Sequence, residues 1–102
     1  MSSGKTYVGI DNDEYGGMTP TGAIVKDAWL FGLIPEEETC EGWTVAALQH
    51  LYDQVTEHWS RYGYRVNQLP PELQERHTRI HEAAMKRARA LGWDPDPADE
   101  ED

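Results

Sequence analysis

The stretch from Ala23 to Ile34 constrains the fold of this chain more than any other feature. Nine of its twelve residues are apolar, and at about 100° per residue they surround nearly a whole helical cylinder. A helix that is apolar on every side must be buried. The stretch therefore predicts either a central helix covered by its own chain or a helix with one face kept for another protein. It is too short to span a bilayer and contains Lys26 and Asp27, so we expect no membrane partner.

Capping residues and glycines predict three helices. The first begins at Thr19 as N-cap and Pro20, and runs to about Leu33. The second runs from Thr44 to Tyr62, and the third from Pro70 and Pro71 to Gly92, with Trp93 folding back over its last turn. The apolar spacing of the second helix predicts a core stripe of Val45, Leu48, Tyr52, Val55 and Trp59.

These elements indicate an all-α fold, a small three-helix bundle with an extended N-terminal arm and a disordered acidic C-terminal tail. A chain of 102 residues is one domain's worth of sequence. We expect residues 1–93 to form a single helical domain with its arm at Lys5–Ile10. Residues 94–102, with six acids and two prolines, form the predicted tail.

Charge is unevenly distributed around a net value of −10. Residues 1–58 carry −8, residues 59–93 carry +4, and residues 94–102 carry −6. Two interpretations fit this pattern. The basic segment is either compensated within the fold, or it forms a helix face that docks an acidic partner and is partly masked by the tail. The acidic total disfavours nucleic acid as a partner.

The compartment is inferred from what the chain lacks. Cys40 is its one cysteine, so no disulfide forms within the chain, and a reducing compartment fits best. No apolar signal segment opens the sequence, and we expect a cytoplasmic protein. The acidic residues on both sides of Cys40 raise the expected thiol pKa, which favours an inert thiol over a catalytic one.

His77 and His81 are the strongest chemical signal, because histidines four apart on a helix can reach one metal ion. His58 is the candidate for a further ligand, and Gln74 adds a polar group on the same side. The alternative is a pair of half-buried packing residues. Other sets are weaker: the loop of Asp11, Asp13 and Glu14 fails the calcium-loop pattern, and His50, Asp53 and Glu57 fall opposite the core stripe. We expect no cofactor.

Aromatic residues exceed what one small core holds comfortably, since the chain has four Trp and five Tyr. The surplus either covers the ends of the bundle or forms a surface for a partner, because Trp and Tyr dominate interface hot spots. The partner-binding candidates are Trp29, Leu30, Leu33, Trp43 and Tyr64.

No catalytic constellation stands out, so we expect a non-enzymatic accessory or regulatory protein. Its predicted mode of action is binding another protein, with a homodimer through the first helix as one form. A metal-binding helical protein that uses His77 and His81 is an alternative. A second alternative is an acidic DNA mimic or nucleic-acid-linked regulator, with the carboxylates of Glu36 to Glu41 and the tail on a basic surface.

Overall fold

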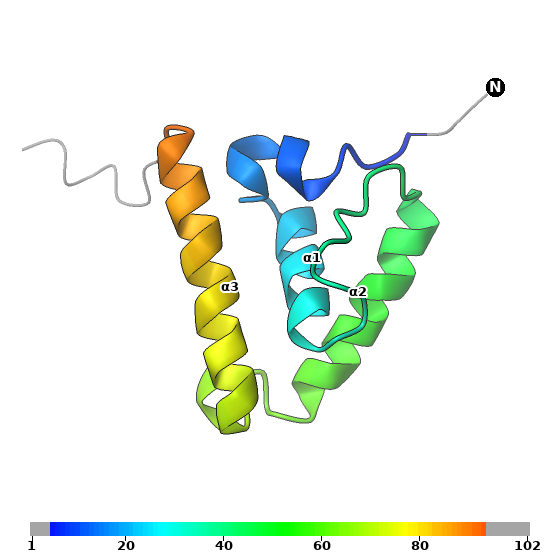
Figure 1. Cartoon of the computed structure of the whole chain (residues 1–102). Helices are drawn as coiled ribbons and strands as arrows, with labels where there is room; N and C mark the ends of the chain where they lie inside the picture. Colours follow the sequence, from blue (N-terminus) through cyan, green and yellow to red (C-terminus); the bar gives the residue numbers. More distant parts are fainter. Residues whose placement is uncertain (1–4, 94–102) are drawn as a thin grey trace, which may run out of the picture.

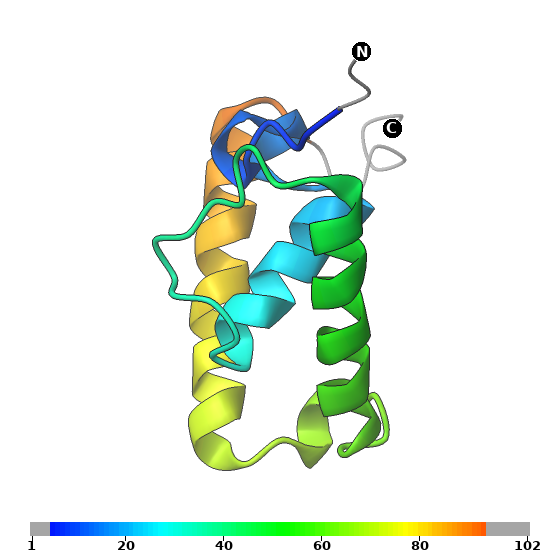
Figure 2. The same ribbon diagram turned by 90° about the vertical axis from the view of Figure 1, so that its right-hand side faces the viewer.

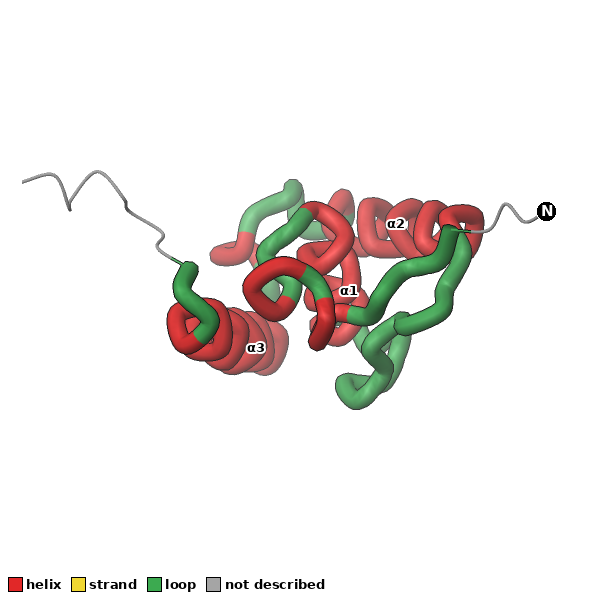
Figure 3. Tube along the Cα trace, turned by 90° about the horizontal axis from the view of Figure 1, so that it is seen from above, coloured by secondary structure: helices red, strands yellow, loops and turns green. Residues whose placement is uncertain are grey.

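Three α-helices form most of the part of the chain that the structure describes, with the apolar one in the middle. The structure is a computed structural model that describes residues 5–93. Helix α1 spans Pro20–Leu30, α2 spans Val45–Ser60 and α3 spans Pro71–Ala90. Helix α1 lies between α2 and α3, as Figures 1 and 3 show from the side and from above. The predicted all-α bundle is confirmed, and the described residues contain no strand, only one isolated bridge between Thr6 and Thr44.

The helices begin where the sequence predicts. The Thr19 hydroxyl accepts a hydrogen bond from the Gly22 amide at 3.0 Å, and Thr44 accepts one from Ala47 at 3.1 Å. Each bond satisfies an amide that has no partner within the helix. Helix α3 begins at Pro71, whose missing N–H costs nothing in the first turn.

The first two helices end earlier than predicted, and glycine geometry explains the first of these ends. Helix α1 ends at Leu30 because Gly32 adopts a φ of 70° and Leu33 donates back to the Ala28 carbonyl at 2.9 Å. Helix α2 ends at Ser60, two residues before the predicted Tyr62. At the end of α3 the prediction is confirmed: Trp93 donates to the Ala88 carbonyl at 2.9 Å, past Gly92 at a φ of 101°.

Helix α1 is the central helix, the first of the two predicted alternatives. Val25 and Ala28 are 0% exposed and Leu30 is 1% exposed. Ile24 is partly buried and only Ala23 among the apolar residues of α1 is exposed. The chain's own elements therefore cover α1, and the described residues leave no apolar stripe on it for a second copy.

The predicted core stripe of α2 is rotated in the structure. Leu51 and Val55 are buried, whereas Val45 is 70% exposed and Tyr52 is 47% exposed. Leu48 and Trp59 pack partly buried against the core. The stripe is narrow because α2 packs mainly on one neighbour, α1, and leaves the edge that holds Val45 and Tyr52 in solvent.

The N-terminal arm lies along the segment that joins α1 to α2. The Tyr7 amide donates to the Trp43 carbonyl at 2.9 Å, and the Ile10 amide donates to Thr39 at 3.0 Å. That segment, residues 31–44, runs along one side of α1 in Figure 2. Two short 3₁₀ turns, η1 (Ile10–Asn12) and η2 (Glu14–Gly16), then lead to α1, and η2 packs on α3.

Among the described residues, none of the helices has the length and apolar character needed to cross a membrane. The acidic segment 94–102, predicted as a tail, lies outside the described residues.

Candidate functional site

The carboxylate of Asp27, a residue of the apolar helix α1, lies where α1 meets both α2 and α3. Its Oδ2 accepts a hydrogen bond from the Trp59 indole of α2 at 3.1 Å. Its Oδ1 lies 4.0 Å from Nε2 of His81 on α3. Burial raises the pKa of Asp27, and the Trp59 hydrogen bond opposes that rise. A single charged residue thus contacts both flanking helices.

The two histidines of α3 stack on each other beside Asp27. Their ring centroids are 4.2 Å apart, and His77 meets the edge of the Trp59 ring at 6.4 Å. Burial, with the neighbouring charges of His77 and Lys26 acting in the same direction, lowers the pKa of His81 to about 4. His81 is therefore neutral at pH 7, and its Nε2 is a buried atom without a hydrogen-bond partner.

Lys26 is the second charged residue of α1 and is 4% exposed. Its Nζ reaches the Met18 sulfur at 3.8 Å. Burial lowers its pKa, and the charge of Asp27 opposes that change. Lys26 and Asp27 are adjacent charged residues inside an apolar run, and this was the sequence signal for the buried polar groups of α1. The sequence alone did not lead us to predict a site there.

The structure does not bring His58 to the other two histidines. His58 stacks on Phe31 at 5.1 Å, and Phe31 in turn meets the edge of Trp59 at 5.2 Å. Gln74, the other polar candidate, donates to the Leu69 carbonyl at 2.8 Å. Within residues 5–93 no three His, Cys, Asp or Glu side chains gather closely enough to hold a metal ion. A metal on His77 and His81 would need a ligand of another kind.

Four of the five partner-binding candidates pack against the core. Trp29 donates from its indole to the Glu38 carbonyl at 2.9 Å, and Leu30 is 1% exposed, so a partner cannot reach the Leu30 side chain in this conformation. Leu33 and Trp43 are partly buried against the first core cluster. Tyr64 alone stands out, with 62% of its surface exposed.

Tyr64 belongs to an aromatic and basic surface that follows α2. We call it the connector surface, and it consists of Arg61, Tyr62, Tyr64, Arg65 and Val66. Val66 is 41% exposed, and Tyr62 is half-buried with its ring stacked 6.3 Å from Phe31. A shallow hollow of about 400 Å³ lies among Arg61, Tyr62, Gly63, Arg65 and Gln68. Sequence reasoning found Tyr64 but missed the arginines that flank it in the run Arg61-Tyr62-Gly63-Tyr64-Arg65.

The backbone at Tyr64 is strained. Its φ is 61°, in the left-handed region that side chains other than glycine avoid. The Tyr64 amide donates to the Trp59 carbonyl at 3.0 Å and closes the end of α2. A large and exposed aromatic side chain thus occupies a backbone conformation that glycine would adopt more easily.

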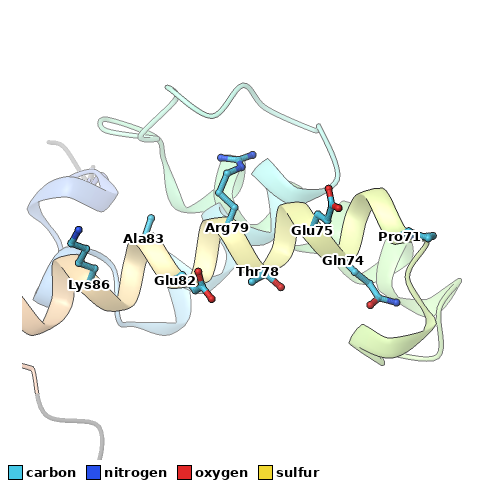
Figure 4. A pocket seen from close by; sticks show the side chains of 8 residues that line it. All are labelled: Pro71, Gln74, Glu75, Thr78, Arg79, Glu82, Ala83 and Lys86. Carbon is cyan, nitrogen blue, oxygen red and sulfur yellow. The ribbon is translucent and has the colours of Figure 1, made fainter.

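Three arginines of α3 bind partners within the molecule. Arg79 forms a two-bond ion pair with Glu36 at 2.8 and 2.9 Å, and Arg87 bonds Asp11 at 2.5 Å. Arg76 donates to the Leu30 carbonyl at 3.1 Å. Arg79 and Arg87 thus compensate acidic charge within the molecule, whereas Arg76 binds a neutral backbone carbonyl. The outward hollow of α3, about 690 Å³, is lined only by residues of that helix, and Figure 4 shows their side chains along one ribbon.

The carboxylates proposed for DNA mimicry are partly used inside the fold. Glu36 binds Arg79, and a Glu38 side-chain oxygen accepts from the Cys40 amide at 3.0 Å. Glu37 and Glu41 are exposed.

Cys40 and Asp13 have structural environments. Burial raises the pKa of the Cys40 thiol to about 11, with Glu38 adding to the rise, and the side chain is 0% exposed, as expected for an inert thiol. Asp13 accepts hydrogen bonds from the Tyr7 hydroxyl at 2.6 Å and the Thr19 hydroxyl at 2.5 Å. Its oxygens thus organise the loop before α1.

Comparison with known proteins adds no relative: no protein-family model, no curated protein and no solved structure matches this chain.

Proposed function

We propose that this chain is a non-enzymatic protein that acts by binding another protein through the connector surface. The observation that carries the proposal is the exposed Tyr64 ring on a strained backbone. Tyrosine and arginine are, with tryptophan, the side chains enriched at interface hot spots, and both occur here side by side. Strained residues persist where the surrounding structure holds them, and they cluster at binding sites.

The energetics favour a role for Tyr64 outside the fold. A left-handed conformation costs a non-glycine residue about 1–2 kcal/mol. The exposed ring returns little of that cost through burial within the chain. A partner that covers the ring would gain its contact area. The backbone strain at Tyr64 is already present in the unbound chain, so binding would not add to it.

The test compares two exposed tyrosines. A photo-crosslinking amino acid is placed at position 64 and, as a matched control, at position 52 on α2, where Tyr52 is 47% exposed. The protein crosslinked from position 64 in the native cells is then purified and titrated calorimetrically with the chain. We expect Tyr64→Ala to weaken binding by about tenfold or more and Tyr52→Ala to leave it unchanged. Equal crosslinking from both positions, or an unchanged affinity of Tyr64→Ala, would contradict the proposal.

A soft metal ion is the second candidate ligand. Met85 lines the same hollow of about 610 Å³ as His77 and His81, so one helix stripe offers two imidazoles and a thioether. Thioether and imidazole ligands suit monovalent copper. Lys86 and Arg89 also line this hollow, and their positive charges oppose a cation.

Titration with silver(I), a stable substitute for copper(I), tests this second function. Binding with one ion per chain that is lost in His77→Ala and reduced in Met85→Leu would support it. The same heat from the double variant His77→Ala and His81→Ala would remove it.

A further inference from the structure

The hollow of the connector surface contains hydrogen-bond donors and no carboxylate. Arg61 and Arg65, which carry guanidinium groups, both line it, and so does Gln68 with its side-chain amide. Tyr62 and Gly63 complete the lining. Guanidinium groups bind carboxylates through paired hydrogen bonds of fixed geometry. The lining is thus suited to an anion, in a chain whose net charge is −10.

Internal partners leave these arginines largely available. Arg61 lies 3.6 Å from Glu57, and both side chains are well exposed, at 58% and 70%. An exposed pair at that separation is weak. Arg79 and Arg87, by contrast, hold their carboxylates at 2.8 and 2.5 Å. The described structure shows no ion pair for Arg65.

We propose that this hollow binds a glutamate or aspartate side chain in an acidic peptide segment of the partner protein. The inference rests on the proposed function and names the chemistry of the partner. Arg61 and Arg65 bind the carboxylate, and the exposed Tyr64 and Val66 contact the apolar part of the segment. A short acidic peptide fits better than a nucleic acid, because the net charge of −10 repels a long polyanion more strongly than a segment with a few carboxylates, which meets mainly the local positive charge.

The chain's own acidic residues 94–102 are a poor occupant of the same copy. The segment that joins α2 to α3 leads into the first turn of α3 (Figure 1), whereas Trp93 follows the last residue of that helix, Ala90. The 20 residues of α3 extend about 30 Å, and nine residues reach at most about 30 Å when fully extended. Even fully extended, residues 94–102 would only just span the length of α3, so they could not also place a side chain in the hollow.

The experiment uses fluorescence anisotropy with the full chain. One probe is a labelled peptide of five Glu-Ser repeats, and the control is the matching peptide of five Gln-Ser repeats. The protein variants are Arg65→Gln and the double variant Arg61→Gln with Arg65→Gln. The control variant is Arg89→Gln, which removes an exposed charge at the far end of α3.

We expect the acidic peptide to bind and the neutral one not to bind. The double variant should weaken binding by about tenfold or more, which corresponds to the loss of a charge-assisted hydrogen bond. The control Arg89→Gln should change the affinity by less than about twofold. Raising the salt concentration should weaken binding. Far-ultraviolet circular dichroism of each variant confirms that it is folded.

Three results would overturn the inference. The first is no binding of the acidic peptide, or equal loss in the Arg89→Gln control. The second is tighter binding of a single-stranded oligonucleotide at the same arginines. The third is concentration-dependent self-association that disappears when the six acids of residues 94–102 are replaced by amides, which would make a second copy the occupant. A partner crosslinked at position 64 would still support the proposed function in the first case, so the two failures are distinguishable.

Discussion

The two long helices hold α1 by different means. On the side of α2, the apolar cluster of Val25, Ala28, Leu51 and Val55 is almost fully buried. On the side of α3, a smaller cluster of Leu30, Leu69 and Ile80 is accompanied by polar contacts. The polar contacts of α3 with α1 are the Asp27–His81 approach and the Arg76 bond to the Leu30 carbonyl. The ion pairs of Arg79 with Glu36 and of Arg87 with Asp11 join α3 to the segments that follow and precede α1. The α2 side has one polar contact with α1, the Trp59 hydrogen bond to Asp27.

This asymmetry predicts different responses of the two interfaces to solvent conditions. Apolar burial near room temperature depends on area and hardly on pH or moderate salt. Charged and imidazole groups depend on both. Helix α3 is therefore the part of the fold that pH and salt should loosen first, while α1 and α2 stay packed.

Leu51→Ala should have the largest effect, because it removes apolar surface from the better-buried side. We expect a loss of about 2–4 kcal/mol in the free energy of unfolding, measured by urea denaturation. Val45→Ala on the same helix is the control, since Val45 is 70% exposed and should change the value by less than about 0.5 kcal/mol. Equal losses of stability in Leu51→Ala and Val45→Ala would mean that Leu51 is not the main contact of α2 with α1.

Acidification should destabilise the α3 side through His81. The folded state lowers the pKa of His81 from 6.5 to about 4, so the unfolded chain takes up the proton first as pH falls. The stability that neutral His81 provides is complete above pH 6.5 and is lost as pH falls toward 4. Because the ring is partly solvent-exposed, we expect a loss of about 1 kcal/mol.

The variant His81→Gln isolates this effect. Its unfolding free energy is measured beside that of the original chain at pH 7 and pH 4.5, and the difference between the two proteins should shrink or reverse at the lower pH. Asp27 acts in the opposite direction, because burial raises its pKa, and this residue is present in both proteins. A pH-independent difference would rule out His81 as the titrating group.

Tyr64→Gly, in the segment that joins α2 to α3, should stabilise the fold. Glycine adopts a φ of 61° without the steric cost that tyrosine bears. We expect the free energy of unfolding to rise by about 0.5–1 kcal/mol while partner binding is lost. Tyr64→Ala keeps the strain and serves as the control. A less stable glycine variant would mean that the Tyr64 ring contributes to the fold.

Arg87→Gln should have the smallest effect. Its pair with Asp11 is short but lies at the surface, with side chains 53% and 57% exposed. We expect a loss below about 0.5 kcal/mol at low salt that disappears in 1 M sodium chloride, measured by thermal unfolding. A larger, salt-independent loss would show that the pair is part of the core packing of α3.

Local sequence signals predicted much of the fold because they act within a few residues. Thr19, Thr44 and the Gly92–Trp93 pair set helix ends through short-range hydrogen bonds, and all three behave as predicted. The rotation of α2 was not predictable to the same degree. Val45 and Leu51 are both apolar, and only the place of α1 decides which of them is buried.

The candidate site divides in the same way. Tyr64 was identified from its residue type and position after Gly63, and it is exposed as expected. Trp29, Leu30 and Trp43 have the same interface chemistry, but the folded chain uses them for its own core or its margin. Apolar surface has no preferred partner, so sequence cannot tell internal packing from external binding.

By itself, the sequence determined that a helix apolar on all sides must be enclosed and where the three helices begin, because these follow from backbone hydrogen bonding and the spacing of apolar residues. Only the tertiary structure decided that the chain encloses that helix itself, that Tyr64 is left exposed between Arg61 and Arg65, and that Arg79 and Arg87 are occupied by distant carboxylates. Such pairings join residues up to 76 positions apart, and no local pattern specifies them.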